Sequence, residues 1–262
     1  LFKPLDEMPA DLKKHLRYPM DLFEIQVQTY AKYHMQDVQV FYNQEDLWEP
    51  PDEIYGDNRQ MMKPYYIIIK LPGEVKEEFL LMLPYTPSKK DNMIGWLAAR
   101  SDLPHYGNLL VYKLSKDKLA YGPMQVEARI DQQTDISREL SLWGQRGSRV
   151  IRGNLLAIPV GDSFIYVEPI YLEAQQEPQR EAQPAPPSKG GQSQQQQPTQ
   201  SARKGSTSTA ALPELKRVIV ALGSRVAMEE NLDRALSRVL GGKIIEKDDV
   251  SSKVPESGEL SE

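Results

Sequence analysis

Short apolar and aromatic runs alternate with turn residues between residues 64 and 172, and this alternation then stops abruptly. The runs have the length and the β-branched or aromatic content of buried strands. They are PYYIIIKL, EEFLLMLP, NLLVYKL, MQVEARI, SRVIRGNLLAIPV and SFIYVEPIYL. The pattern predicts a packed, strand-rich region that ends near Leu172.

Two hairpins are the clearest local predictions in this region. The runs PYYIIIKL and EEFLLMLP flank Pro72 and Gly73, which favour a turn between antiparallel strands. Residues 150–160 and 164–172 flank a Gly-Asp-Ser turn, in which Gly161 can supply a positive φ. The second hairpin is therefore predicted to join two long strands.

Helical signals occur at three places outside the hairpins. Asp21 and Glu24 have the spacing of a capping box, and apolar residues then recur at near-helical intervals up to Met35. Residues 93–100 and 135–143 each follow short polar residues that can cap a helix. Helices and hairpins together predict an α+β fold, with a mixed, largely antiparallel sheet and flanking helices.

The remaining segments predict the domain organisation. Residues 1–172 form one α+β globular domain, in which the proline-containing stretch 49–63 is expected to be a loop. Residues 173–211 lack every large apolar side chain and are rich in Gln, Pro, Ser and Gly, which predicts a disordered linker. Residues 212–242 predict a strand, LPELKRVIVALG, and a helix, MEENLDRALSRVLGG. This β-α element is too small to fold alone, so it must dock onto the main domain, join a partner or stay marginal. Residues 243–262 are expected to be a flexible tail.

Composition excludes several classes of function. The net charge of -5 argues against nucleic-acid binding, because displacing counterions from phosphates requires a basic surface. The chain has no cysteine, which excludes disulfides, thiolate metal sites and a cysteine nucleophile. No segment approaches the roughly 20 apolar residues that span a bilayer. His15, His34 and His105 lack a second ligand at metal-binding spacing, so neither a metal nor a cofactor is predicted.

The most suggestive polar cluster is WGQRGSRVIRGN. It predicts a binding surface for an anion or a protein partner, made by Arg146, Arg149, Arg152 and Asn154. Guanidinium groups bind carboxylates and phosphates in a bidentate fork, and the interspersed glycines let a backbone approach a ligand closely. The alternative is that these arginines pair with the domain's own acids, for example in the stretch 127–135.

Two further patterns are weaker. Ser101, Asp102 and His105 have the residue types of a hydrolytic triad, but triad members come from separated elements, and the G-x-S-x-G turn is absent. Gly223 and Ser224 fall between a predicted strand and a predicted helix, where backbone N–H groups can hold a phosphate. The other glycines of a dinucleotide motif are missing, so an ordinary βα loop is the simpler interpretation. No catalytic residue is predicted.

Several blocks together resemble one protein family. They are LDEMPADLKKHLRYPMDLF, YHMQDVQVFYNQEDLWE, KPYYIIIKLPGE, EEFLLMLPYTPSKKDNMIGWLAARSD, YGPMQVEARIDQ, SRVIRGNLLAIPV, SFIYVEPIYLEA and, after the linker, LPELKRVIVALGSRVAMEENLDRAL. They are similar to the carboxy-terminal region of bacterial multipass membrane proteins of Uncharacterised Protein Family 0182. The resemblance implies a parent chain with transmembrane helices near its N-terminal end, followed by a large soluble portion. It also implies a location at the cell membrane, with this region extracytoplasmic, and it carries no catalytic residue.

These observations favour a non-catalytic binding or assembly domain of a multipass membrane protein. The expected partners are the remainder of the parent protein and a further protein or acidic ligand, with contact to the membrane only through the missing helices. The alternative is a cell-envelope enzyme, such as a hydrolase, whose residues converge only in three dimensions.

Overall fold

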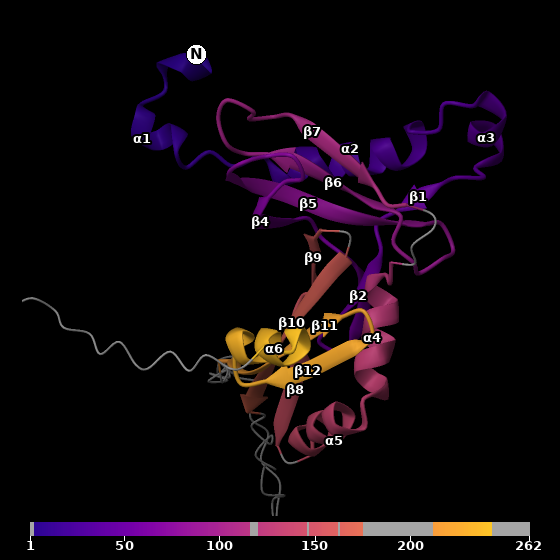
Figure 1. The fold of residues 1–262 in the computed structure, drawn as a ribbon, viewed down its shortest axis with the longest axis vertical. Helices are drawn as coiled ribbons and strands as arrows, with labels where there is room; N and C mark the ends of the chain where they lie inside the picture. The colour runs from indigo at the N-terminus through magenta and orange to yellow at the C-terminus, as the bar shows by residue number, and fades with distance from the viewer. Residues whose placement is uncertain (1–2, 116–119, 146, 162, 175–211, 243–262) are drawn as a thin grey trace, which may run out of the picture.

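A computed structural model describes residues 3–115, 120–145, 147–161, 163–174 and 212–242 (Figure 1). Within these residues, two five-stranded antiparallel sheets lie one above the other. The first sheet contains β1 (Trp48–Glu49), β4 (Tyr65–Lys70), β5 (Glu77–Pro87), β6 (Gly95–Arg100) and β7 (Leu109–Lys113). The second contains β8 (Ser148–Arg152), β9 (Leu156–Val160), β10 (Ser163–Ala174), β11 (Glu214–Leu222) and β12 (Arg225–Glu229). The α+β, largely antiparallel fold predicted from the sequence is confirmed.

A two-stranded hairpin and several helices surround the two sheets. The hairpin consists of β2 (Asp52–Tyr55) and β3 (Asn58–Met61). The helices are η1 (Leu5–Glu7), α1 (Ala10–Lys13), α2 (Met20–Tyr33), α3 (Val38–Asn43), α4 (Pro123–Gln132), α5 (Thr134–Trp143) and α6 (Leu232–Leu240). Figure 1 shows α2 beside the first sheet, and α4, α5 and α6 around the second.

The first sheet is covered on both faces. Its inner strands, β5 and β6, read as nearly continuous apolar runs, as expected for strands without a solvated face. On one face, Leu83 and Tyr85 pack in a core with Phe23 and Val27 of α2. The opposite face contributes to a second core, which it shares with the other sheet. The residues of that shared core include Met82, Trp96, Val126, Ile130, Tyr166, Ile170 and Ile219.

The second sheet is built around β10, and the C-terminal element forms part of it. Strand β11 pairs with β10 along eight register positions, and β12 pairs with β11. Ile219 faces the shared core, whereas Val220 faces the other way and packs with Ala235 and Val239 of α6. The segment predicted to dock, join a partner or stay marginal therefore docks onto the main sheet.

Both predicted hairpins are present. Strand β4 pairs with β5 in antiparallel register, and Gly73 has a φ of +85° in the turn between them. Val160 pairs with Ser163 at the end of the β9–β10 hairpin, and Gly161 has a φ of +57°. The expected strand over residues 150–160 is divided into β8 and β9, which pair with successive parts of β10.

Four local predictions were wrong. The run MQVEARI is helix α4 rather than a strand, because Val126 and Ile130 lie one turn apart and both bury in the shared core. Residues 93–100 contain strand β6 rather than a helix. Residues 49–63 contain the β2–β3 hairpin rather than only a loop, and Gly56 supplies a positive φ at its turn. Met228 lies in β12, which was missed, so the last helix begins only after Asn231, whose side chain caps it.

Two further boundaries differ from the prediction. Helix α2 begins at Met20 after Pro19, with no capping hydrogen bond from the side chain of Asp21. Strand β10 continues to Ala174, two residues beyond the predicted end of the domain. The rest of the predicted linker, residues 175–211, and the predicted tail, residues 243–262, lie outside the described residues.

Candidate functional site

The four residues of the predicted arginine surface do not converge. Arg146 lies outside the described residues. Arg149 is half exposed on β8, with its Nη2 3.5 Å from Asp57 Oδ2. Arg152 is buried at the end of β8, and Asn154 is exposed in the break that follows. Because residues three apart in a strand point to opposite faces, Arg149 and Arg152 cannot hold one ligand between them.

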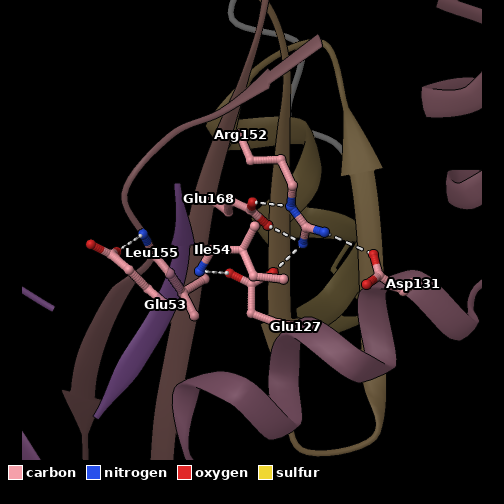
Figure 2. Close-up of polar contacts among 7 residues, drawn as sticks. All are labelled: Glu53, Ile54, Glu127, Asp131, Arg152, Leu155 and Glu168. Carbon is pink, nitrogen blue, oxygen red and sulfur yellow. Dashed lines mark hydrogen bonds and ion pairs between the residues drawn. The ribbon is translucent and has the colours of Figure 1, made fainter. Parts of the chain in front are cut away.

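Arg152 instead lies at the centre of an ion cluster, which we define as Arg152, Glu53, Glu127, Asp131 and Glu168 and which is buried except at Asp131 (Figure 2). Its Nε donates to Glu168 Oε1 at 2.7 Å and its Nη2 to Glu168 Oε2 at 3.1 Å. Its Nη1 donates to Asp131 Oδ1 at 2.8 Å, and its Nη2 also donates to Glu127 Oε2. These four hydrogen bonds leave little of the guanidinium for an external anion.

Local structure explains why these side chains meet. Glu127 and Asp131 are four residues apart on α4, so both lie on one face of the helix and reach the same guanidinium. Arg152 pairs in register with Ile170 of β10, and Glu168 lies two residues earlier in that strand, on the same face. A Cβ on Gly153 would lie 2.6 Å from Pro169 Cγ, so only glycine lets the end of β8 pass this close to β10.

Glu53 joins the ion cluster to the β2–β3 hairpin. Its Oε2 accepts a hydrogen bond from the backbone N–H of Leu155 at 2.9 Å, in the break between β8 and β9. Its Oε1 accepts from Gln60 Nε2 at 3.1 Å. The next residue, Ile54, donates its N–H to Glu127 at 3.4 Å. The ion cluster therefore holds together β2, α4, β8 and β10.

The ion cluster contains more carboxylates than cations. Burial raises the pKa of Glu127 to about 8, and the negative charge of Glu168 adds to the effect, while Arg152 opposes it. Burial also raises the pKa of Glu168 and of Glu53, although Arg152 and Lys63 respectively act in the other direction. Two buried carboxylates on one guanidinium, with the buried Glu53 in the same cluster, are therefore expected to retain a proton at neutral pH. The ion cluster can therefore bind a proton, and it connects β2, α4, β8 and β10.

Stability should consequently fall as pH rises. A carboxyl group whose pKa is higher in the folded than in the unfolded chain favours folding below its unfolded pKa, and that contribution is lost as pH rises through the folded value. The relevant window for Glu127 runs from its ordinary value near 4.5 to about 8. Each unit of difference corresponds to about 1.4 kcal/mol. Urea unfolding should therefore show at least about 1.4 kcal/mol less stability at pH 9 than at pH 6.

The substitution Glu127→Gln tests the source of this pH dependence. Glutamine has the shape of a protonated glutamate and cannot ionise. The stability of the variant should therefore decline much less between pH 6 and pH 9. The matched control is Glu24→Gln, which removes an exposed carboxylate on α2. An unchanged decline in Glu127→Gln would contradict a proton stored at Glu127.

A second feature is an apolar groove beside α2, with a volume of about 710 Å³. Its apolar lining includes Ile25, Tyr33, Met61, Met62, Pro64 and Leu83. Carboxylates of Asp21 and Glu24 lie on its α2 wall toward the start of the helix, and Lys32 lies near the end. The groove is a hydrophobic depression bordered by charges of both signs, as protein-binding surfaces commonly are.

Several apolar residues that line the groove, and others on α2 and α3, are exposed. The exposed fractions are 45% for Leu22, 65% for Ile25, 69% for Tyr33 and 53% for Met61. The ring of Tyr33 stacks on that of Phe41 in α3, with centroids 5.6 Å apart. A contiguous exposed apolar surface of this kind usually contacts something else. We refer to Leu22, Ile25, Tyr33, Phe41 and Met61 as the α2 surface.

The other candidates from the sequence do not form sites. The Oγ of Ser101 accepts the backbone N–H of Tyr18, and Asp102 accepts that of Phe79, so neither side chain is directed at His105 as in a triad. Gly223 lies in the tight turn between β11 and β12, so the prediction of a strand-to-helix loop at this position was wrong. Among the residues that the structure describes, no group of three or more His, Asp or Glu side chains could hold a metal ion.

Sequence reasoning found Arg152 but missed Glu53 and Glu168. Glu168 carried a signal, because it is the one charged residue within the apolar run SFIYVEPIYL, and a charge inside a buried strand requires a partner. Glu53 carried none, since it lies in a stretch interpreted as a loop. The alternative that these arginines pair with acids of residues 127–135 describes Arg152, which contacts Glu127 and Asp131.

The fold and these surfaces define an α+β protein with two stacked antiparallel sheets, an internal ion cluster and an exposed apolar groove. The model of the Uncharacterised protein family (UPF0182) matches residues 1–143, and the chain belongs to this family. A UPF0182 protein of Pelotomaculum thermopropionicum is 50% identical over 98% of this chain and 25% of its own length. A UPF0182 protein of Sulfurovum is 54% identical over 91% of the chain and 22% of its own length.

The chain thus spans about a quarter of the length of the curated relatives that it matches. No solved structure matches it. Within the described part of the chain, none of the helices has both the length and the apolar character needed to cross a membrane.

Proposed function

We propose that this chain is a non-catalytic assembly region of a longer, membrane-anchored protein, and that it docks onto the remainder of that protein through the α2 surface. The exposed apolar groove beside α2 is the observation that carries the proposal. Ile25, Tyr33 and Met61 line a preformed depression and expose much of their apolar area, which is unfavourable in water unless another surface covers it.

The length of the relatives supports the choice of occupant. Relatives at about 50% identity contain this whole region as about a quarter of their sequence. The other three quarters are thus the nearest available partner, and a covalently linked partner has a high effective concentration. The resemblance to multipass membrane proteins supports anchoring of the parent protein at the cell membrane, with this region on the extracytoplasmic side.

The hydrolase alternative lacks a corresponding geometry. Among the described residues, neither His34 nor His105 lines the apolar groove or either of two further pockets, of about 330 and 340 Å³. The ring of His34 contacts the rings of both Tyr30 and Trp48, and its Nε2 is 3.6 Å from Asp46. The described contacts of the His34 ring are thus with two aromatic rings and an acidic neighbour.

The substitution Ile25→Asp tests the proposal directly. The longer protein would be produced as two co-expressed polypeptides, one of them this chain, and their association measured by co-purification and titration. An aspartate at position 25 places a charge in the apolar groove, so affinity should fall at least tenfold, whereas the melting temperature of the chain should stay unchanged because Ile25 is 65% exposed.

The matched control is Leu142→Asp, which alters a similarly exposed apolar residue, 57% exposed, on α5. It should leave association unchanged. Equal association of the original chain and the Ile25→Asp variant would remove the α2 surface as the docking site. Failure of the two original polypeptides to associate would overturn the proposed function itself.

A further inference from the structure

Strand β4 forms an unprotected apolar edge of the first sheet. It pairs with β5 on one side, from Tyr65 opposite Met82 to Lys70 opposite Glu77. No other strand among the described residues pairs with it. Figure 1 shows β4 at the border of the sheet, away from β7 at the other border.

The outer backbone groups of β4 have no partner within the described part of the chain. In an antiparallel pair, alternate residues turn their N–H and C=O groups away from the neighbouring strand. Among the described residues, hydrogen bonds between β4 and elements other than β5 involve only the side chains of Tyr65 and Tyr66, which donate to Ala157 O and Tyr18 O. The outer edge therefore presents a row of free donors and acceptors, which is a template for another strand.

The strand is held rigidly in position. Tyr65, Ile67 and Ile69 pack against the core shared by the two sheets, and Tyr66 packs against the core beneath α2. Ile68 points outward and is 63% exposed. A preformed edge loses little conformational entropy when a second strand adds to it, which favours strand addition.

The usual protection against strand addition is confined to the ends of β4. Lys63 and Pro64 precede the strand, and Lys70 is its last residue. The five residues from Tyr65 to Ile69 contain no charge, no proline and no glycine, the features that blunt natural edges. An edge of this composition is a favourable site for the addition of another strand.

We propose that β4 receives an extended apolar strand from the remainder of the longer protein, which adds to the first sheet by antiparallel or parallel pairing and has acidic residues near its ends. This inference rests on the proposed function and names the second contact between the two parts. The added strand would satisfy the outer backbone groups of β4 and cover Ile68.

Charge complementarity selects this occupant over a second copy of the chain. Two β4 strands paired antiparallel about their common centre would place Lys70 of each copy diagonally next to Lys63 of the other. Like charges at such cross-strand positions are destabilising. Acidic residues flanking an apolar strand would instead pair with Lys63 and Lys70, both exposed.

Hydrogen exchange provides the readout, because it reports backbone pairing rather than association alone. The amides on the outer edge of β4 should exchange rapidly in this chain alone and at least tenfold more slowly in the full-length protein. The inward-facing amides, bonded to β5, should be protected in both. The chain is suited to the comparison because its two sheets share one buried core and each also packs against a helix on its other face.

The variant Ile68→Lys places a charge in the middle of the edge. It should weaken association of the two co-expressed polypeptides at least tenfold, without changing the melting temperature of this chain. Val75→Lys, in the turn after β4 and 86% exposed, is the matched control and should behave as the original chain does.

The outcomes separate this inference from the proposed function. Association with unprotected outer β4 amides would overturn strand addition while leaving the docking function intact. No association at all would overturn both. Protection of these amides in the isolated chain, together with a dimer in sedimentation, would identify a second copy as the occupant. This result would overturn the assignment of the added strand to the remainder of the longer protein.

Discussion

Replacing Arg152 with methionine should lower the free energy of unfolding by about 3–5 kcal/mol at pH 7. The side chain is almost fully buried, and its loss leaves Glu168, Glu127 and Asp131 without their common partner. Removing one member of a buried ion pair is strongly destabilising because the remaining charge lacks both water and a counterion. Natural domains are stable by only about 5–15 kcal/mol, so the expected loss is a large part of the total free energy of unfolding. Urea unfolding followed by circular dichroism measures the loss.

Arg149→Met is the matched control for this experiment. The substitution has the same chemistry in the same strand, but Arg149 is half exposed and its only described ion pair is the 3.5 Å contact with Asp57. Exposed pairs contribute roughly 0–1 kcal/mol. The two variants should therefore differ severalfold in their effect, although they lie three residues apart on β8.

A double substitution distinguishes lost charge compensation from lost packing. If unpaired carboxylates cause the damage, Glu168→Gln should restore part of the stability of Arg152→Met, and lowering the pH should do the same because the carboxyl groups can then take up protons. An Arg152→Met variant as stable as Arg149→Met, or one that neither glutamine nor acid improves, would show that the ion cluster does not hold the fold together.

Local turn chemistry made the two hairpins predictable. Gly73 and Gly161 have positive φ angles, which glycine adopts without strain, and each lies between runs of strand-forming residues. Such signals depend on a few neighbouring residues, and the folded structure retains them. The α+β class followed from the same signals.

The missed elements depended on contacts distant in the chain. The segment after residue 92 became β6 because β5 and β7 bind both of its edges and two cores bury both of its faces. A Cβ on Gly95 would lie 2.5 Å from the carbonyl oxygen of Tyr112, a constraint that only the folded sheet reveals. The run MQVEARI is short enough to fit either period, and only its packing on the shared core decides for a helix.

Only part of the candidate site was predictable, because its contacts also join residues that are distant in the chain. Spacing alone placed Arg149 and Arg152 together as one surface, because sequence proximity does not show on which face of a strand each residue lies. The structure separates them into an exposed residue and a buried one. The carboxylates that hold Arg152 come from β10 and α4, with Glu53 of β2 completing the ion cluster, and no local pattern connects these elements.

Replacing Ile219 with alanine should destabilise the whole chain by about 2–5 kcal/mol. Ile219 is 1% exposed in β11 and lies in the core shared by the two sheets, together with Met82, Trp96 and Ile170. The loss of a buried side chain leaves a cavity that its neighbours fill only partly. Because this core joins both sheets, unfolding should remain a single transition that shifts to lower urea concentration.

Leu215→Ala is the control within the same strand, because Leu215 is 50% exposed and should contribute little. The comparison tests whether the C-terminal element is a structural strand or an appendage. If β11 were only tethered, both variants would leave the transition of the main domain in place, and Ile219→Ala would at most loosen the last segment. A shift of the whole transition by Ile219→Ala alone would instead show that residues from beyond residue 211 complete the core of the domain, so that the element cannot be removed without unfolding the rest.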